Sequence, residues 1–448
     1  MTQPTFLLSP IKSAISADGG VLEVMLRVQA PDQNRDLAAK PTRKRLAMVV
    51  DRSGSMNGQP LTEALRCVAH VASRLTPDDQ MTVVVYDHCV NVLYPLGPVL
   101  SPQAIQDAIA QIESGGNTNL FGGWETGAQQ LEGGIDSSIS RVLLLSDGQA
   151  NHGLCQIDAI EQHCRDWLAK GVSTTTVGLG RGFNDDLMIA MARAGGGQQY
   201  YGQMAEDLFD NFDEELSLLH ALYLRQLAVK LIPASGVIVE PLGLVQQHPD
   251  GSHQLSDLAW GAEAWLMVRL HVSADSVGVG GDARDLLAAT LEARTLEGQT
   301  ITTHASMLRL PVLPQIDVAA LAVDELVHRR LQEVDFAESS QALRQLVQLG
   351  DIYAARALLT ELEKRFAKHP WLLDKLAHLR ELAAQDPELM SKEVRFSGMR
   401  MSNRLSEKFE VQYSCDETDF VIPAFLRKKA QEGKGRKSPP NNGSQAKP

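Results

Sequence analysis

Between residues 43 and 222, short apolar runs alternate with amphipathic stretches. The runs RLAMVVD, MTVVVYD, RVLLLSD and VSTTTVGLG are apolar and rich in β-branched residues, while LTEALRCVAHVASRL, LFGGWETGAQQLEG and DLFDNFDEELSLLHALYL have helical spacing. Continuous apolar strands separated by helices predict an α/β fold with a doubly wound, mainly parallel sheet covered on both faces. Ligands of such sheets bind beyond the carboxyl ends of the strands.

Residues 223–314 show β-type patterns instead. The runs LAVKLIPASGVIVEPLG, AWLMVRLHVS, LLAATLEARTLEG and TITTHASMLRLPVLP predict an antiparallel β-sandwich. Within residues 1–42, the runs FLLSPIKSAIS and VLEVMLRVQA flank the turn ADGG and predict a hairpin over 5–30. A lone hairpin is marginal in water, so we expect it to pair with strands from 225–312. The α/β unit, residues 43–222, would then be an insertion in the sandwich.

The pattern from 315 to 386 is helical throughout. The run ALRQLVQLGDIYAARALLTELEKRFAKHP has a helix, a turn at Gly350–Asp351 and a second helix that ends before Pro370. It is similar to one tetratricopeptide unit, but no second copy follows, so we expect a helical bundle that supports the body and not a repeat array. Residues 387–448 form an extended tail, whose composition from 431 onward is typical of disorder.

The composition narrows the function classes. A net charge of −13 over 448 residues argues against general nucleic-acid binding, which requires a basic face. The 5 cysteines contain no CxxC pair and are interpreted as reduced thiols. The chain has no signal-peptide pattern at its start and no apolar run of about 18 residues. These features predict a cytoplasmic protein that does not enter a membrane.

Side chains with oxygen atoms follow two of the predicted strands and occupy one glycine-rich loop. MVVDRSGSM ends a strand on an acid and continues with two serines, SGGNTNLFGG holds a threonine between glycine pairs, and LLLSDG ends a later strand on an acid. The candidate ligands are Asp51, Ser53, Ser55, Thr118 and Asp147. Such oxygen clusters hold hard cations. The structural alternative is that Asp51 caps the following helix while the serines satisfy turn amides.

This DxSxS motif, with the threonine and the later aspartate, resembles the metal-ion-dependent adhesion site of von Willebrand factor type A domains. The resemblance covers about residues 45–220, and the wider layout resembles stand-alone bacterial members of that superfamily. It implies bound Mg²⁺, with Mn²⁺ or Ca²⁺ as alternatives, and a partner protein whose acidic side chain completes the metal shell. It also implies work beside a MoxR-type AAA+ ATPase or a kinase and phosphatase system. We expect Asp51→Ala to abolish metal binding with the fold intact, because Asp51 would belong to a surface site and not to the core.

Enzyme motifs are missing from the sequence. The text RSGSM is not a GxSxG elbow, GLGRGF at 178–183 breaks GxGxxG, and no GxxxxGK[ST] occurs. His88, His152 and His163 show no zinc spacing. We therefore expect no catalysis. Two alternatives stay open: a metal-dependent hydrolase that uses Asp51 and Asp147, and a structural assembly subunit in which the metal only stabilises the fold.

The peptide DETDFVIPAFLRKKAQ, residues 416–431, has an acidic start, an apolar centre and a basic end. It resembles the C-terminal peptide of the bacterial tubulin-like division GTPase, with which it shares IPAFLRK. One interpretation is a docking peptide for a partner that also reads such division-protein tails, and the other is that the apolar residues pack on the chain's own body. The candidate contact residues are Phe420, Ile422, Pro423, Phe425, Leu426 and Arg427.

Overall fold

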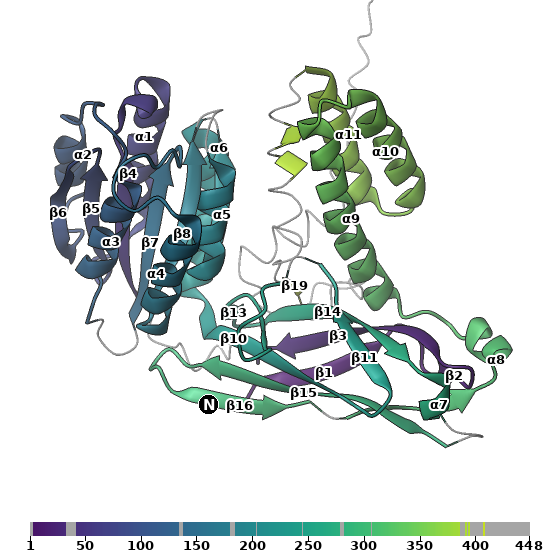
Figure 1. Ribbon diagram of the computed structural model, residues 1–448. Helices are drawn as coiled ribbons and strands as arrows, with labels where there is room; N and C mark the ends of the chain where they lie inside the picture. The colour runs from purple at the N-terminus through teal and green to yellow at the C-terminus, as the bar shows by residue number, and fades with distance from the viewer. Residues whose placement is uncertain are drawn as a thin grey trace, which may run out of the picture.

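The chain folds into an α/β unit, a β-sandwich and a helical module (Figure 1). The computed structural model describes residues 3–32, 42–133, 138–179, 184–202, 204–243, 245–277, 282–305, 307–385, 390–391, 393–394 and 406–407. The candidate docking peptide at 416–431 lies outside these residues, as do residues 180–183 of the GLGRGF stretch.

The α/β unit is built on a six-stranded sheet with the order β6-β5-β4-β7-β8-β9. Neighbouring strands are parallel except β5 and β6, which pair antiparallel. The mainly parallel sheet that the sequence predicts is therefore confirmed, with one antiparallel edge strand added. The strands are β4 (Arg43–Asp51), β5 (Gln80–Tyr86), β6 (Val90–Pro98), β7 (Ser138–Ser146), β8 (Val172–Leu179) and β9 (Gly196–Gly202).

Helices cover both faces of this sheet, and alternate residues of β4 show why. Met48 and Val50 pack with α1, α2 and α6, while Ala47 and Val49 face α3, α4 and α5. Because both faces are buried, the positions from Leu46 to Val50 are all apolar and the alternation typical of a half-exposed strand is lost. The helices are α1 (Gln59–Arg74), α2 (Pro102–Ile109), α3 (Leu120–Gln130), α4 (Ile157–Ala169), α5 (Asp185–Ala194) and α6 (Ala205–His220).

The sandwich consists of two antiparallel sheets with apolar side chains between them. One sheet has the order β1-β3-β14-β11, with β19 also on β14, and the other has the order β12-β10-β15-β16, with β13 on β10 and β17 on β15. The strands of the first sheet are β1 (Thr5–Pro10), β3 (Gly20–Gln29), β14 (Ala262–Val272), β11 (Val237–Pro241) and β19 (Ser406–Glu407). Those of the second are β10 (Leu222–Pro233), β12 (His253–Gln254), β13 (Leu258–Ala259), β15 (Arg284–Arg294), β16 (Thr300–His304) and β17 (Leu308–Leu310).

The first strands of the chain belong to the sandwich. β3 pairs with β14 along its whole length, from Gly20 opposite Val272 to Gln29 opposite Glu263. This is the pairing that the sequence predicts for residues 5–30, and it makes the α/β unit an insertion between β3 and β10. The predicted turn at ADGG is present, and Gly19 N donates to Ser16 O at 3.0 Å. The connection from β1 to β3 is longer than a simple hairpin, because β2 (Ile15–Ser16) comes before the turn, pairs with β18 (Val312–Leu313) and buries Ile15 in the sandwich core.

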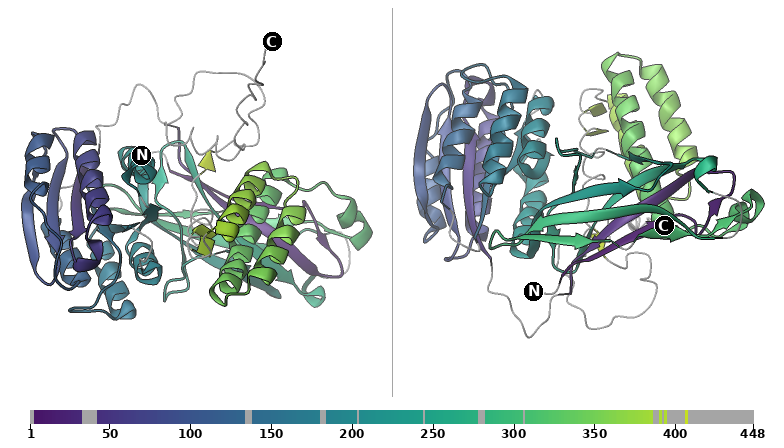
Figure 2. Two further views of the ribbon diagram at one scale, coloured as in Figure 1. Left: turned by 90° about the horizontal axis from the view of Figure 1, so that it is seen from above. Right: turned by 60° about the horizontal axis from the view of Figure 1, so that its bottom comes forward.

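The helical module stands on the sandwich (Figure 2). The buried side chains Val327 and Val334 of α9 pack with Met25, Trp265 and Met267 of the first sheet. The module consists of α8 (Gln315–Ala320), α9 (Glu325–Gln348), α10 (Ile352–Arg365) and α11 (Pro370–Gln385), and the short α7 (Ala274–Val277) precedes β15. Among the helices described, none has the length and hydropathy needed to cross a bilayer.

Candidate metal centre

Three loops with oxygen-bearing side chains meet at one edge of the α/β sheet. β4 pairs in parallel with both β5 and β7, so the loops that follow β4 and β7 leave the sheet at the same edge. The loop before α3 is tied to both of them by the hydrogen bonds described below. This topology collects the five predicted ligands, which are Asp51, Ser53, Ser55, Thr118 and Asp147.

The first loop sets two hydroxyls beside a buried carboxylate. Asp51, the last residue of β4, is 0% exposed, and its Oδ1 accepts a hydrogen bond of 2.8 Å from the backbone N of Ser53. A short 3-10 turn, Gly54–Met56, follows, and buried Met56 anchors it to the core beneath. The Oγ atoms of Ser53 and Ser55 lie 3.1 Å apart. The loop therefore presents a pair of neutral oxygens next to one charged group.

The carboxylate of Asp51 also joins three strands, which the sequence did not indicate. Its Oδ2 accepts hydrogen bonds from Ser146 Oγ at 2.6 Å and from Tyr86 Oη at 3.3 Å. The expectation that Asp51 stands outside the core is wrong, because β4 ends beneath the loops and not on top of them. Replacing Asp51 by alanine would leave two buried hydroxyls without their acceptor, so the neutral isostere asparagine is the better test of its charge.

Backbone bonds tie the first loop to the glycine-rich loop. Gly54 N donates to Gly116 O at 3.1 Å, and Gly115 N donates to Arg52 O at 2.9 Å. Gly116 has a φ of 76°, in the left-handed region that favours glycine. The glycines before the threonine thus let the backbones of the two loops approach each other, and the hydrogen bonds between them fix the position of the second loop relative to the first.

Thr118 of the second loop is held by the loop that follows Asp147. Its backbone N donates to Asn151 Oδ1 at 2.8 Å, and its carbonyl accepts from Asn151 N at 3.2 Å and His152 N at 3.1 Å. The side chain of Thr118 is 2% exposed. Because all three of these bonds use Thr118 backbone atoms, none of them engages the hydroxyl.

Asp147 begins the third loop and is 6% exposed. Its Oδ1 accepts from Gln149 N at 3.2 Å, and its carbonyl accepts from Asn184 N at 2.7 Å, just before α5. Gly148 has a φ of 68°, and a Cβ there would lie 2.9 Å from Asn184 O. The loop is therefore shaped by a glycine that no other residue could replace without strain.

The two acids of the site have no basic partner within the described part of the chain, where no Lys or Arg side chain pairs with Asp51 or Asp147. The pKa of Asp51 is raised to about 6, because burial and, less strongly, the charge of Asp147 outweigh the hydrogen bonds from Ser146 and Ser53 that lower it. Buried carboxylates with neutral hydroxyls around them are the donor set that a hard divalent cation takes. The residues present therefore fit the ion that the motif implies.

Three residues of the site were missed from the sequence. Ser146 and Tyr86 end the strands on either side of β4, and the alignment of parallel strand ends could have found both of them as neighbours of Asp51. Asn151 bonds Thr118 through loop geometry, and no pattern in the sequence signals that contact.

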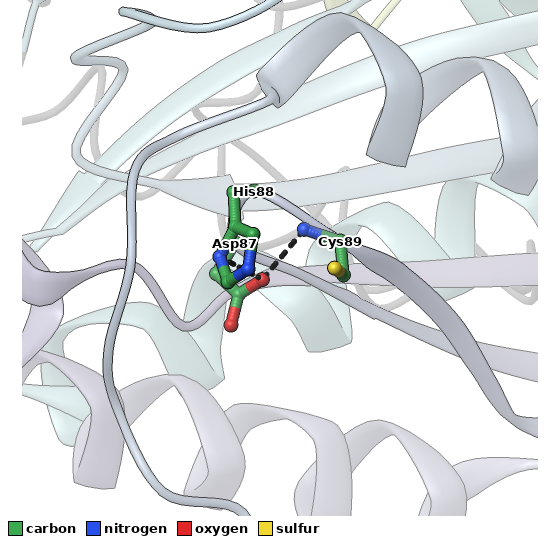
Figure 3. A group of neighbouring side chains, drawn as sticks. All are labelled: Asp87, His88 and Cys89. Carbon is green, nitrogen blue, oxygen red and sulfur yellow. Dashed lines mark hydrogen bonds and ion pairs between the residues drawn. The ribbon is translucent and has the colours of Figure 1, made fainter.

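The three histidines that the sequence analysis considered, His88, His152 and His163, lie at different places in the domain. The ring of His163 lies against Phe121, with centroids 4.8 Å apart, and His152 contributes its backbone N. His88 lies beside Asp87 and Cys89 at the turn between β5 and β6 (Figure 3). The tail residues from Phe420 to Arg427 lie outside the described residues, so the docking and self-packing interpretations of the tail both stay predictions.

The segment that contains this site matches a known protein family. Residues 46–214 match the family model of the von Willebrand factor type A domain. The chain is 25% identical over 268 residues to the uncharacterized protein sll0103 of Synechocystis sp., which covers 56% of this chain and 61% of that protein. The chain therefore spans less than two thirds of the length of this relative.

Two solved structures share the fold of nearly the whole chain. A von Willebrand factor type A protein from Catenulispora acidiphila has a TM-score of 0.67 at 15% identity and covers 88% of this chain and 96% of its own. The ArnB paralog VWA2 from Sulfolobus acidocaldarius has a TM-score of 0.56 at 17% identity and covers 90% and 99%. None of these three names is that of an enzyme, and domains of this type typically mediate protein–protein interactions.

Proposed function

We propose, from the premise that residues 46–214 form a von Willebrand factor type A domain, that this chain is a metal-dependent protein-interaction scaffold. In this proposal Asp51, Ser53, Ser55, Thr118 and Asp147 hold Mg²⁺, with Mn²⁺ or Ca²⁺ as alternatives. An acidic side chain of a partner protein completes the coordination. The sandwich and the helical module carry the domain and offer further contact surface.

The observation that supports the proposal most strongly is the imbalance of charge at the three loops. Two nearly buried carboxylates lie beside three hydroxyl-bearing residues, and no basic side chain pairs with them in the described residues. Magnesium prefers about six oxygen ligands and keeps several waters. Two carboxylates, neutral oxygens and water leave room at the metal for one more anionic ligand. A partner's Asp or Glu has the charge and the reach to fill it.

The residues of the chain have distinct parts in this proposal. Asp51 supplies negative charge from within the sheet, and the hydrogen bonds from Ser146 and Tyr86 fix the orientation of its carboxylate. Ser53 and Ser55 present adjacent hydroxyls, and Asn151 holds the backbone of Thr118 in place. The bound cation supplies the positive charge that attracts the partner's carboxylate. No nucleophile or general base is needed for this function.

The setting of the protein and its partners are part of the same proposal. The cysteine usage favours the cytoplasm, and the resemblance to bacterial relatives favours a MoxR-type AAA+ ATPase or a kinase and phosphatase system as partner. The peptide at 416–431 would provide a second docking element, and its covalent link to the metal-binding domain would raise its effective concentration for a partner already bound at the metal.

A pull-down with the full-length chain tests the proposal. Immobilised protein is exposed to lysate with Mg²⁺ or with EDTA, beside Asp147→Ala and the control Asp107→Ala, an exposed acid on α2. The proposal expects one defined protein to be captured with Mg²⁺, released by EDTA, lost with Asp147→Ala and retained with Asp107→Ala. Identical capture under all four conditions would contradict it. Lower stability in EDTA with no change in capture would favour the structural alternative, and turnover of a substrate would favour the hydrolase.

A further inference from the structure

The turn between β5 and β6 brings together three side chains with different donor atoms. Asp87, His88 and Cys89 are consecutive, and a carboxylate oxygen, an imidazole nitrogen and the thiol sulfur all lie within 4.8 Å of one another. Figure 3 shows the carboxylate of Asp87 beside the imidazole of His88 at this turn. The cluster shares no residue with the candidate metal centre formed by Asp51, Ser53, Ser55, Thr118 and Asp147, which we call the oxygen site.

The contacts of the cluster hold the carboxylate and leave the other two donors accessible. Asp87 is 5% exposed. Its Oδ1 lies 3.2 Å from His88 Nδ1 and accepts a hydrogen bond from Cys89 N at 2.7 Å. Its Oδ2 lies 3.0 Å from Arg52 Nη2. His88 and Cys89 are both exposed. Arg52 therefore neutralises one oxygen of Asp87 and fixes the group, while the face toward His88 and Cys89 remains open to a ligand.

The turn is braced from the glycine-rich loop, so the donors have a defined place. Asn119 N donates to Asp87 O at 2.8 Å. Gly116 lies so close to the imidazole that any Cβ at this position would overlap Nδ1 of His88. The glycine thus leaves the space in which the ring stands, with its Nδ1 toward the carboxylate.

The donor set identifies the class of ligand. Nitrogen and sulfur donors with one carboxylate suit Zn²⁺ and similar borderline-soft ions, whereas Mg²⁺ takes oxygen. A tetrahedral zinc site has bonds of about 2.0–2.3 Å, which place the ligand atoms about 3.5 Å apart. The exposed side chains of His88 and Cys89 can close the remaining gap by small rotations. The carboxylate and a thiolate supply two negative charges, and with Arg52 included the cluster and a divalent cation keep one net positive charge.

We propose that Asp87, His88 and Cys89 form a second metal site, for a thiophilic divalent cation of the Zn²⁺ class, with water or a partner's side chain as fourth ligand. Binding releases the proton of Cys89 Sγ to solvent, and the neutral imidazole of His88 binds through Nδ1 in the tautomer that carries its proton on Nε2. Rules based on histidine spacing overlook this site because its three ligands are adjacent in the sequence.

Titration of the full-length, reduced and chelator-treated protein with Co²⁺ tests the proposal. Excess Mg²⁺ is present throughout, so that the oxygen site is filled by the hard ion. We expect one equivalent of Co²⁺ to bind with a thiolate-to-metal charge-transfer absorption band, and one equivalent of Zn²⁺ to remove that band. Cys89→Ser should abolish the band, and His88→Ala should weaken Co²⁺ binding at least about tenfold.

Cys155→Ser is the matched control, because Cys155 is a second, partly exposed thiol near the same edge of the domain. It should titrate like the parent protein. His88→Ala and Cys89→Ser both change exposed side chains, so a failure to fold is not expected, and circular dichroism checks this for each variant. A band that survives Cys89→Ser, normal Co²⁺ binding by His88→Ala, or the absence of saturable binding by the parent protein would each overturn the proposal.

Discussion

Polar clusters lie near both ends of β7, and they differ in how their charges are balanced. Near its start, Arg141 is 2% exposed, pairs with Glu215 of α6 and lies with Nη2 3.2 Å from Asp257 Oδ2. Its Nε donates to Ser173 Oγ at 2.8 Å. We call these four residues the arginine cluster. Asp257 precedes β13 of the sandwich, so the cluster joins the α/β unit to the sandwich, and Arg141 is the cation that the two acids share.

At the other end of β7, the oxygen site has buried acids and no paired cation in the described residues. Asp51 and Asp147 lie beside hydroxyl groups, and burial raises the pKa of Asp51 to about 6. The α/β domain thus has buried carboxylates under opposite conditions, because Glu215 has a paired cation and Asp51 has none in the described residues. The arginine cluster, in which the acids have a cation, explains how the α/β domain is attached to the sandwich. The oxygen site, in which the acids have none in the described residues, indicates where a cation from solution binds.

The largest expected effect on stability comes from removing the cation of the arginine cluster. Arg141→Met removes the cation that Glu215 and Asp257 share and leaves the buried carboxylate of Glu215 without its ion-pair partner, so we expect a loss of about 3–5 kcal/mol in the free energy of unfolding. Urea unfolding at neutral pH measures it. The control is Arg74→Met, whose exposed pair with Asp213 should contribute no more than about 1 kcal/mol. Equal losses in the two variants would contradict the comparison.

A neutral residue in the oxygen site should have the opposite effect on stability. The pKa of Asp51 lies above its ordinary value of 3.8, so the metal-free protein loses stability as the pH rises from about 4 through about 6. The side chain in Asp51→Asn does not ionise. In EDTA at pH 7 the free energy of unfolding of this variant should therefore exceed that of the parent by up to about 3 kcal/mol. It should also lose Mg²⁺ binding. A variant that is less stable in EDTA, or that still binds Mg²⁺, would show that the charge of Asp51 has another role.

The same pKa predicts a pH dependence of metal binding. A proton on Asp51 competes with the cation, and at pH 5 only about a tenth of this carboxylate is ionised if its pKa is about 6. We therefore expect Mg²⁺ affinity to fall about tenfold between pH 7 and pH 5. Calorimetric titration at the two pH values measures this ratio. An affinity that does not change with pH would place the metal away from Asp51.

The smallest expected effect on stability concerns the tail. If 416–431 is a docking peptide, deletion of 416–448 leaves the melting temperature unchanged and lowers partner capture, since burial of two apolar anchors in a partner groove contributes roughly 3–6 kcal/mol before ordering costs. Scanning calorimetry and the pull-down described above are run on the same preparation. A drop of several degrees with capture intact would instead mean that the tail packs on the chain's own body.

The fold was largely predictable because the α/β unit, the sandwich and the helical module each have their own spacing of apolar residues. The continuous apolar run of β4 predicted a strand buried on both faces, and Met48 and Ala47 do pack on opposite sides. The edge strands β6 and β9 were missed because their positions are mostly half-exposed and their residues mixed. The short strand β2 before the turn at ADGG was missed because Ile15 packs in the sandwich core and lies opposite Val312, a tertiary contact that local turn chemistry does not reveal.

The residues of the candidate metal site could be predicted from the sequence, but their burial and hydrogen bonds could not. A motif names Asp51 and its partners, yet the burial of that carboxylate and its bonds to Ser146 and Tyr86 depend on the register of three strands. The arginine cluster was not predictable at all, because Arg141 stands within an apolar strand and its partners come from α6 and from the sandwich.

The central claim is that the oxygen site accepts a hard cation, and the exchange of one hydroxyl tests it most directly. Thr118→Val keeps the shape of the side chain and removes one oxygen from the site, while Thr126→Val does the same on α3, where Thr126 Oγ1 only donates to Gly122 O at 2.8 Å. Mg²⁺ is titrated into the full-length, chelator-treated proteins in a calorimeter. The account predicts one Mg²⁺ per chain for the parent and for Thr126→Val, and a large loss of affinity for Thr118→Val. No binding by the parent, or equal binding by all three proteins, would contradict it.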